Sequence, residues 1–489
     1  MLLKEILRNV NCKWVQGKNP EIEDIVIDSR KVKYGSLFVC LKGLKSDGHQ
    51  YVKQAANAGA AAVLAQEAIT NPPDNITIAQ TDNTRAALAL CAEAFFNYPA
   101  DSFNLVGITG TKGKTTSTYL MENVLAHYRH RVGVIGTLGA KVAGVPLNIH
   151  YDTSTTPDPV ELQHILSVMR DDHVNDVVME VSSQALSFDK VEGMMFNIGL
   201  FTNLTQDHLD FHKTMEDYMR AKSKMFKQCR QGVINADSDA GLEIIKIHKR
   251  AQSACTFTTF SIERPSELRA ININYPENGV SFCVEINGCT ENFFVPIKGR
   301  FTVYNALGVI GAALIMGIPV EVIKQGLAVI KGVPGRIQDV PNDKGRHVIV
   351  DYAHSPDSLV NIINAVREFT KGRVMVVFGC GGDRDALKRP MMGKIAGELA
   401  DFCIVTSDNP RTENPMDIIA AIEGGIKETN CPHETISDRR EAIFRAVKLA
   451  EPTDTLIIAG KGHENYQIIG EATIHFDDLE VAQEALEAL

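Results

Sequence analysis

The stretch that decides the fold is Phe103–Tyr128, FNLVGITGTKGKTTSTYLMENVLAHY. Its first seven residues predict an apolar strand, and the residues from Thr115 onward predict a helix. The turn between them carries glycines at positions 107, 110 and 113, followed by the pair Lys114-Thr115. Backbone amides of such a turn and the N-terminus of the next helix attract anions. We therefore predict a phosphate-binding loop in which Lys114 reaches the β- and γ-phosphates and Thr115 holds Mg²⁺.

This loop is a variant of the usual phosphate loop. The strict spacing G-x-x-x-x-G-K-[ST] would place a glycine at position 108, where this chain has Ile108. An ordinary strand-to-helix turn is the alternative interpretation. The coincidence of a strand, three glycines, a Lys-Thr pair and a helix favours the phosphate site.

Strands and helices continue to alternate on the C-terminal side of the loop, which predicts an α/β fold with parallel sheets and right-handed crossovers. We expect three domains, over residues 1–102, 103–332 and 333–489. In the first, alanine-rich helices are predicted over residues 51–65 and 83–99. The second carries the predicted strands HRVGVIGT, NDVVMEVSS, FNIGLFTNL and QGVINAD. Residues 253–296 are β-rich and predict a small antiparallel insert within it.

Composition excludes several classes of protein. The chain has 489 residues, and a net charge of −10 argues against a general nucleic-acid binder. The 10 cysteines include no CxxC pair, which indicates a reduced, cytoplasmic protein without a zinc site. No run reaches 18 apolar residues, and the charged N-terminus does not resemble a signal peptide. We expect a protein without membrane or nucleic-acid partners.

Two segments after the loop predict metal ligands. Glu180 ends the strand NDVVMEVSS, where it could hold a metal or have only a capping or solvated role. The turn FTNLTQDHLDFH follows the next strand and carries polar side chains at Asn203, Asp207, His208, Asp210 and His212. A polar turn of this kind often binds no ligand. Because it follows the strand after Glu180, however, we interpret it as a second metal position.

Lys222 lies on the apolar face of a predicted helix. In EDYMRAKSKMF, helical spacing groups it with Tyr218, Met225 and Phe226, whereas Lys224 points elsewhere. One interpretation is a packed stem with its amine reaching water. The other is a buried, neutral amine that reacts with CO₂ to give a carbamate, an oxygen ligand suited to Mg²⁺.

Together these motifs resemble the Mur ligase family of ATP-dependent amide-forming enzymes in peptidoglycan synthesis. The resemblance covers the whole chain and follows the family's motif order: GITGTKGKTT, MEVSSQAL, FTNLTQDHLDFH, YMRAKSKMF, GRFTVYN, GVPGR, VDYAHSPDSL, DNPR and GKGHE. It implies an N-terminal α/β domain that binds UDP-muramoyl substrate. It also implies a central ATP-binding domain and a C-terminal Rossmann-like domain that binds the incoming amino acid.

The resemblance also implies roles for individual residues. It assigns catalytic roles to Lys114, Glu180, His208 and Lys222. It assigns the ligands of two magnesium sites to Thr115, Glu180, His208 and Lys222, the last of these as a carbamate. The residues matching ATP contacts are Gly110, Thr111, Lys112, Gly113, Lys114, Thr115, Thr116, Asn305, Arg336 and Asp351, with His354 in the same motif as Asp351. Those matching contacts to UDP-MurNAc-L-Ala-D-Glu are Ser29, Thr155, Thr156, Ser182 and Lys190. The implied reaction passes through an acyl phosphate, and we expect a monomer.

Four positions depart from the family pattern. Thr302 stands where asparagine is usual, Gln338 where glutamate is common, and Met225 where leucine is usual. Lys190 replaces a common substrate-binding arginine and loses its forked geometry. None of these changes removes a catalytic group.

The segment Asp408-Asn409-Pro410-Arg411 predicts which amino acid is added. Pro410 restricts Asn409 to extended geometry and so aims Arg411, whose guanidinium can grip a carboxylate. In the family, this motif is the signature of members that add meso-diaminopimelate, and the remaining matching contacts are Arg389, Gly460 and Glu464. A lysine-adding ligase is the alternative within the family, folylpolyglutamate synthetase is more distant, and a nucleotide switch without ligase activity is the alternative outside it.

Overall fold

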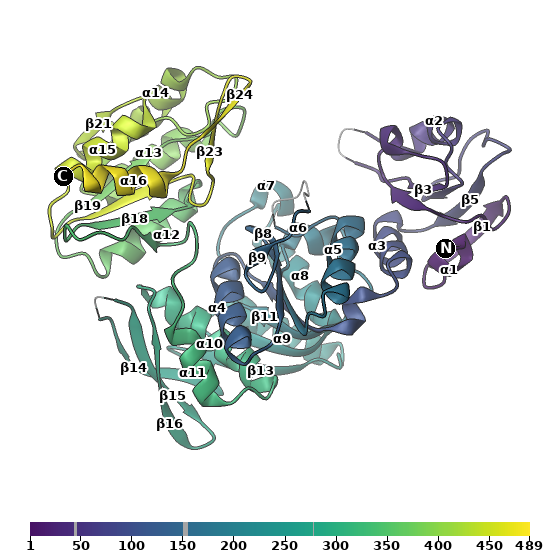
Figure 1. Cartoon of the computed structure of the whole chain (residues 1–489), viewed down its shortest axis with the longest axis horizontal. Helices are drawn as coiled ribbons and strands as arrows, with labels where there is room; N and C mark the ends of the chain where they lie inside the picture. The colour runs from purple at the N-terminus through teal and green to yellow at the C-terminus, as the bar shows by residue number, and fades with distance from the viewer. Residues whose placement is uncertain (44–45, 150–154, 277) are drawn as a thin grey trace. The chain divides into compact units, whose positions relative to one another are not determined.

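The computed structural model describes residues 1–43, 46–149, 155–276 and 278–489 (Figure 1). The chain forms two compact units. The first contains residues 1–260, 264–267 and 308–319, and the second contains residues 261–263, 268–307 and 320–489. Among the described helices, none combines the length and the apolar character needed to cross a membrane.

The first unit begins with a five-stranded sheet in the order β1-β5-β4-β3-β2. Strands β2 to β5 are parallel, and β1 is antiparallel to β5. The strand bounds are β1 (Cys12–Gln16), β2 (Asp24–Val26), β3 (Ser36–Val39), β4 (Ala62–Ala65) and β5 (Thr77–Thr81). The accompanying helices are α1 (Leu3–Ile6), α2 (Val52–Asn57) and α3 (Thr84–Phe95), and the side chain of Asn83 caps α3.

The predicted helix over residues 51–65 is wrong in its second half. Helix α2 ends at Asn57, and Gly59 adopts a φ of +100°, which turns the chain out of the helix. Residues 62–65 then form the buried strand β4 between β3 and β5. Alanine favours a helix locally, but here burial within a parallel sheet outweighs that preference.

The second sheet is built around β6 (Asn104–Thr109), and the part described with this unit runs in the order β13-β12-β11-β6-β10-β7-β8-β9. The strands from β13 to β7 are parallel, and β8 and β9 are antiparallel. Their bounds are β7 (Val132–Gly136), β8 (Gly139–Val142), β9 (Val145–Pro146), β10 (Asp176–Glu180), β11 (Phe196–Phe201), β12 (Cys229–Asn235) and β13 (Thr256–Ser261). The helices are α4 (Lys114–His127), α5 (Pro159–Asp171), α6 (Ser183–Ser187), α7 (Leu209–His212), α8 (Met215–Ser223) and α9 (Asp239–Arg250).

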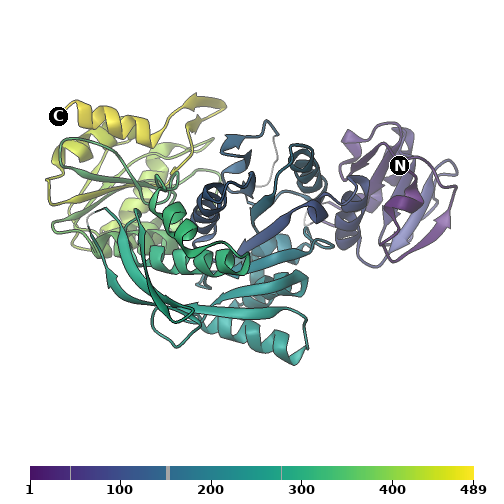
Figure 2. The ribbon, with the colours of Figure 1, turned by 60° about the horizontal axis from the view of Figure 1, so that its bottom comes forward.

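The predicted antiparallel insert over residues 253–296 starts too early. Strand β13 pairs parallel with β12 and so continues the parallel sheet. In the second unit, β14 (Leu268–Asn274), β15 (Val280–Ile286) and β16 (Cys289–Val295) form the antiparallel meander (Figure 2). Alternating apolar residues do not distinguish a parallel from an antiparallel partner, which explains the error.

The second unit contains a six-stranded sheet in the order β17-β18-β22-β19-β20-β21. All neighbouring strands are parallel except β17. One face packs against α12, α13 and α14, and the other packs against α15 and α16. The strands are β17 (Gln338–Asp339), β18 (His347–Asp351), β19 (Val374–Phe378), β20 (Phe402–Val405), β21 (His433–Thr435) and β22 (Thr455–Ala459), and β23 (Tyr466–Ile469) and β24 (Ala472–His475) form a separate hairpin.

The remaining helices of the chain are α10 (Arg300–Ile315), α11 (Val320–Ala328), α12 (Pro356–Arg367), α13 (Lys388–Leu399), α14 (Pro415–Ile426), α15 (Arg439–Leu449) and α16 (Asp478–Glu487). The α/β prediction with parallel sheets is confirmed. The division at residues 102 and 332 stays a prediction.

Candidate active site

The predicted phosphate loop connects β6 to α4. Gly110 has a φ of +150°, and Gly113, which precedes the first turn of α4, has a φ of +84°. A Cβ atom on Gly110 would lie 1.9 Å from Thr202 Oγ1, so no larger residue fits there without movement. Asn203 braces the loop: its Oδ1 accepts from the backbone N–H of Lys112 at 3.0 Å, and its Nδ2 donates to the carbonyl of the same residue at 3.1 Å.

Two lysine side chains meet at this loop. The amine of Lys114 donates to the carbonyls of Gly110 at 3.0 Å and Thr111 at 3.1 Å. The amine of Lys222, from α8, donates to the same Gly110 carbonyl at 2.8 Å. The structure therefore brings together two predicted catalytic residues that lie more than a hundred positions apart in the sequence.

Lys222 is buried, with only 1% of its surface exposed. Its helical neighbours Tyr218, Met225 and Phe226 are equally buried, and its amine lies 4.5 Å from the centre of the Tyr218 ring. Burial, reinforced by the positive charge of Lys114, holds the pKa of Lys222 well below that of an ordinary lysine. Of the two interpretations, the neutral buried amine therefore fits this position and the water-reaching amine does not.

Glu180 ends β10 and is almost completely buried. Its carboxylate accepts two bonds from Thr137, one from the backbone N–H and one from the hydroxyl, each at 3.1 Å. Each carboxylate oxygen keeps a second lone pair, so this arrangement still suits a metal ligand. Sequence reasoning missed Thr137, although it is the first polar residue after β7, at the same sheet edge as Glu180.

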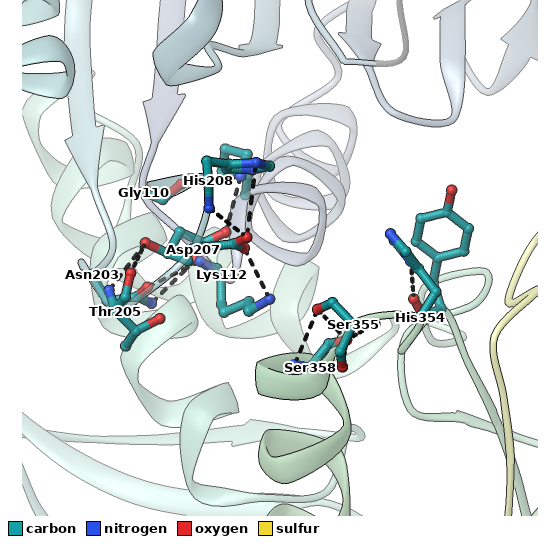
Figure 3. A network of polar contacts seen from close by, with 12 residues as sticks. Gly110, Lys112, Asn203, Thr205, Asp207, His208, His354, Ser355 and Ser358 are labelled. Atoms are coloured by element: carbon teal, nitrogen blue, oxygen red, sulfur yellow. Dashed lines mark hydrogen bonds and ion pairs between the residues drawn. The ribbon is translucent and has the colours of Figure 1, made fainter. Parts of the chain in front are cut away.

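The turn after β11 is organised by Asp207, which lies between His208 and Lys112 (Figure 3). Its carboxylate is 3.4 Å from the Lys112 amine and 3.8 Å from His208 Nδ1. Burial opposes ionisation of Asp207, but the charge of Lys112, together with its contacts to His208, holds the pKa of Asp207 below the ordinary value. His208 adopts a φ of +52°, a left-handed backbone that is uncommon for a residue other than glycine.

His212, in the same turn, has a different setting from His208. It is buried, its Nε2 lies 2.8 Å from Ser183 Oγ, and its ring stacks on Tyr218. The polar turn therefore carries one exposed histidine, His208, and one buried histidine, His212. The packing of His212 accounts for its presence in the turn. The side chain of Asp210 lies outside the described residues.

The residues predicted to contact the muramoyl dipeptide surround the end of β10. Thr156 Oγ1 donates to the Glu180 carbonyl at 3.0 Å and accepts from the Ser182 N–H at 3.0 Å. Thr155 Oγ1 lies 3.3 Å from Thr137 Oγ1. Lys190, which replaces the usual arginine, donates to the Thr156 carbonyl at 3.4 Å and is 2.6 Å from an oxygen of Asp158.

Ser182 and Ser29 also have local structural roles. The Ser182 hydroxyl accepts from the Ala185 N–H and caps α6. Ser29 lies in the N-terminal sheet region, is 9% exposed and donates to Gln54 Oε1 at 3.3 Å. No described contact joins Ser29 to Thr155, Thr156 or Ser182.

Three predicted nucleotide contacts lie in the second unit. Asn305, on α10, is 4% exposed, and within the described part of the chain no acceptor lies within hydrogen-bonding distance of its Nδ2 atom. The Arg336 guanidinium lies 5.1 Å from the centre of the Tyr352 ring. Asp351, at the end of β18, accepts from the Ile337 N–H at 2.9 Å. An unsatisfied buried amide suits a nucleobase, which offers ring-nitrogen acceptors.

The predicted amino-acid site lies at the carboxyl ends of β20 and β22. Asp408 and Asn409 are buried, and Arg411 adopts a φ of +52°. Both backbone groups of Arg411 bond to the hairpin: its N–H donates to the Ile468 carbonyl at 3.1 Å, and its carbonyl accepts from the Gly470 N–H at 2.7 Å. The proline turn is therefore fixed from a second chain segment that sequence reasoning did not include.

The guanidinium groups of Arg411 and Arg389 have partners within this unit. Arg411 Nη1 donates to the Gly382 carbonyl at 2.8 Å. Arg389 forms two parallel bonds with the carboxylate of Glu413, at 2.8 and 2.9 Å. Glu413 carries no sequence signal of its own, and its pairing with Arg389 emerges only in the folded chain.

Glu464 and Gly460 lie beside the same motif. Glu464 accepts from Asn409 Nδ2 at 3.1 Å and from the Tyr352 hydroxyl at 3.3 Å. Burial, followed by the charge of Asp408, raises the pKa of Glu464. Gly460 has a φ of +121°, and a Cβ atom there would lie 2.6 Å from Asp408 Oδ2. The structure thus brings Asp408, Asn409, Gly460 and Glu464 together.

Models of one family match most of the chain. The Mur ligase middle domain matches residues 108–313, the Mur ligase glutamate ligase domain matches residues 335–462, and the Mur ligase family catalytic domain matches residues 21–111. A UDP-N-acetylmuramoyl-L-alanyl-D-glutamate–2,6-diaminopimelate ligase of Clostridium acetobutylicum is 44% identical over 487 residues, which cover 99% of this chain and 100% of the relative.

Solved structures agree with this match. A structure described as a UDP-N-acetylmuramoyl-L-alanyl-D-glutamate–2,6-diaminopimelate ligase is 29% identical, covers 100% of this chain and 99% of its own, and has a TM-score of 0.71. The MurF ligase of Thermotoga maritima, solved in complex with ADP, is 19% identical with a TM-score of 0.58, over 95% of this chain and 97% of its own. At that identity, the second likeness shows the fold alone.

Proposed function

This chain belongs to the Mur ligase family, and from that premise we propose that it joins meso-diaminopimelate to UDP-N-acetylmuramoyl-L-alanyl-D-glutamate in peptidoglycan precursor synthesis. Mur ligases form amide bonds at the expense of ATP, so the chain is an ATP-dependent ligase. The observation that carries the choice of substrate is the full-length 44% identity to a ligase named for diaminopimelate. Arg411, whose backbone is held by the β23–β24 hairpin and which lies two positions after the Glu464 partner Asn409, supports the same choice.

The proposed reaction starts at the phosphate loop. The terminal carboxylate of the muramoyl dipeptide attacks the γ-phosphate of ATP, and an acyl phosphate and ADP result. Two anions must approach each other, so the site must supply positive charge. Lys114 is the loop residue for the β- and γ-phosphates, and the loop amides from Gly110 to Thr116 would surround them. Arg336, in the second unit, is a further proposed contact to ATP. Asn305 and Asp351 would contact the nucleoside.

We assign the ligands of two Mg²⁺ ions to Thr115, Glu180, His208 and Lys222. The hydroxyl and carboxylate oxygens suit Mg²⁺, and Glu180 keeps lone pairs beside its Thr137 bonds, whereas the His208 imidazole is assigned on the family resemblance alone. Burial and the lowered pKa of Lys222 support its conversion to a carbamate, which would supply oxygen ligands. When bound, Mg²⁺ neutralises the phosphate charge that develops during transfer.

The substrates are assigned to separate groups of residues. Ser29 would contact the uridine part, and Thr155, Thr156, Ser182 and Lys190 would contact the muramoyl dipeptide. Lys190 is a point charge with one described acidic partner, Asp158, so it would hold an anion through charge rather than through a fork. Diaminopimelate is assigned to Arg389, Asp408, Asn409, Arg411, Gly460 and Glu464.

Specificity follows from the far end of the incoming amino acid. Diaminopimelate ends in an ammonium and a carboxylate, so both Glu464 and Arg411 gain a partner. Lysine ends in an amine alone, which leaves Arg411 without its anion and places two cations near each other. A lysine-adding ligase is the second candidate function. The Arg411 side chain disfavours it, because lysine offers no second carboxylate.

The proposal also covers the location, oligomeric state, domain division and partners of the protein. We propose a cytoplasmic monomer with three domains, over residues 1–102, 103–332 and 333–489, and no nucleic-acid or membrane partner. The net charge of −10 supports the exclusion of nucleic acid.

One assay tests the proposed function. Purified protein is given ATP, Mg²⁺ and UDP-MurNAc-L-Ala-D-Glu, together with meso-diaminopimelate, lysine or lanthionine, and ADP release is measured. We expect release that requires both the dipeptide and diaminopimelate. Preference for lysine would favour the second candidate, and release that requires neither substrate would contradict a ligase.

A further inference from the structure

Lys461 is a fully buried lysine just beyond β22, next to Gly460. Its amine donates to Asn409 Oδ1 at 2.9 Å and to the Tyr466 carbonyl at 2.6 Å, and it lies 3.9 Å from an Asp408 oxygen. Burial lowers the pKa of Lys461, which means that its charged form is costly here. A buried amine with two well-formed bonds at a substrate site requires a structural or functional explanation.

Lys461 and the Ile468 N–H together fix which way the Asn409 amide points. Asn409 Oδ1 accepts from the Lys461 amine and also from the Ile468 N–H at 3.0 Å. A flipped amide would direct its NH₂ group at these two donors, so the observed orientation is the only one that satisfies them. Asn409 Nδ2 must therefore face the opposite way, where it donates to Glu464 Oε2 at 3.1 Å.

Glu464 is thereby held at both carboxylate oxygens. Asn409 holds Oε2, and the Tyr352 hydroxyl donates to Oε1 at 3.3 Å. Several groups facing this carboxylate titrate or carry charge. Burial and Asp408 favour its neutral form, whereas Lys461, Asn409 and Tyr352 favour the anion. The buried Arg439 and the exposed Tyr466 also couple to it.

We propose that Lys461 is a positioning residue that, through Asn409, fixes the Glu464 carboxylate to receive the ammonium group of the incoming diamino acid. Lys461 does not touch the substrate itself. This inference rests on the proposed function and deepens it, because it explains how the specificity site is built. The second hydrogen bond of the Lys461 amine, to the Tyr466 carbonyl, connects Lys461 to β23. Strand β23 in turn bonds to the backbone of Arg411.

The test compares Lys461→Met with the wild type in the full-length enzyme. Methionine keeps an unbranched side chain, one heavy atom shorter than lysine, but cannot donate a hydrogen bond. We expect the KM for diaminopimelate to rise about tenfold or more, as the loss of a bond in a charged network implies, while the KM for ATP changes less than about twofold. Lys394→Met is the matched control. Lys394 is an exposed lysine on α13 that pairs with Glu428, and its replacement should change neither KM value.

A pH profile separates positioning from a general loss of structure. Removing the positive charge beside Glu464 should raise the pKa of this carboxyl, and so move the acid limb of kcat/KM for diaminopimelate to higher pH. Should Lys461→Met fail to fold, Asn409→Asp tests the same link. It keeps a partner for Lys461, removes the donor to Glu464, and should likewise raise the KM for diaminopimelate and move the acid limb upward.

The outcomes distinguish the two levels of the proposal. A wild-type enzyme without diaminopimelate-dependent ADP release would overturn the proposed function. An active wild type, together with a folded Lys461→Met that keeps the original KM for diaminopimelate and the original acid limb, would overturn the role of Lys461 alone. An equal loss of affinity for ATP and diaminopimelate would also overturn it.

Discussion

The side-chain amines of Lys114 and Lys222 donate to one carbonyl oxygen, that of Gly110, at 3.0 and 2.8 Å. Two ammonium groups on one acceptor would repel each other, and the pKa of Lys222 is held well below the ordinary value by burial and by Lys114. Burial and the charge of Lys114 therefore disfavour the ammonium form of Lys222, and the shared acceptor holds its amine at the glycine-rich loop. The neutral amine is the form that reacts with CO₂, so this setting supports the carbamate that we propose there.

Lys222→Ala should nearly abolish turnover. We expect a loss of about 100-fold or more in kcat, because an oxygen ligand of the proposed metal site disappears. Added short carboxylates should restore part of the activity by occupying the vacated space. Lys246→Ala, at an exposed lysine on α9, is the control. Full activity of Lys222→Ala would rule out the assigned role.

Arg411→Ala should impair the use of diaminopimelate far more than ATP binding. The KM for diaminopimelate should rise about 10- to 100-fold, which corresponds to the loss of hydrogen bonds to a charged group. The preference for diaminopimelate over lysine should fall in parallel. Arg445→Ala, which breaks an exposed pair with Glu434, is the control in the same unit. Equal losses for ATP and diaminopimelate would mean that Arg411 acts elsewhere.

Gly110→Ala should damage the phosphate loop. The added Cβ would meet Thr202 Oγ1 at 1.9 Å, so we expect a destabilisation of roughly 2–5 kcal/mol together with loss of ATP binding. Gly139→Ala is the matched control, because Gly139 has a φ of +93° with nothing within 4 Å of the new atom. It should cost only about 1–2 kcal/mol of backbone strain. Urea unfolding and ATP titration measure both effects, and an undamaged Gly110→Ala would contradict the clash.

Glu93→Gln should change how stability depends on pH. Burial, and then the charge of Asp101, raises the pKa of Glu93 to about 7 from an ordinary value of 4.5. The folded state therefore binds an extra proton between these values, and the stabilising contribution, complete below pH 4.5, is lost as pH rises through about 7. The neutral variant should unfold about 2–4 °C higher than the wild type at pH 8, with little difference at pH 4.5.

The control for this prediction is Glu216→Gln, at a glutamate whose side chain is 66% exposed. Its replacement should change the unfolding temperature little, because an exposed side chain keeps most of its contact with water in the folded protein. A Glu93→Gln variant that behaves in the same way would show that Glu93 does not titrate as its burial implies.

The sequence alone was enough for the α/β class and the family, and it also predicts the glycine-rich loop between β6 and α4 as a phosphate site. These features depend on local patterns: apolar strands alternate with helices, glycines precede Lys114-Thr115, and the motifs occur in a fixed order. Helical spacing also predicted the buried face that carries Lys222, because that face is a property of one helix. Local pattern failed at residues 62–65, where pairing with distant strands, rather than alanine's helix preference, decides the structure.

Only the tertiary structure decided which side chains share a partner. The meeting of Lys114 and Lys222 at Gly110, the pairing of Arg389 with Glu413, and the link from Lys461 through Asn409 to Glu464 each join segments between 4 and 112 positions apart. Hydrogen bonds depend on distances of about 3 Å and on orientation, and neither is encoded in the spacing of residues along the chain. In a parallel sheet the carboxyl ends of the strands lie at one edge. Side chains that are far apart in the sequence can therefore come close together there.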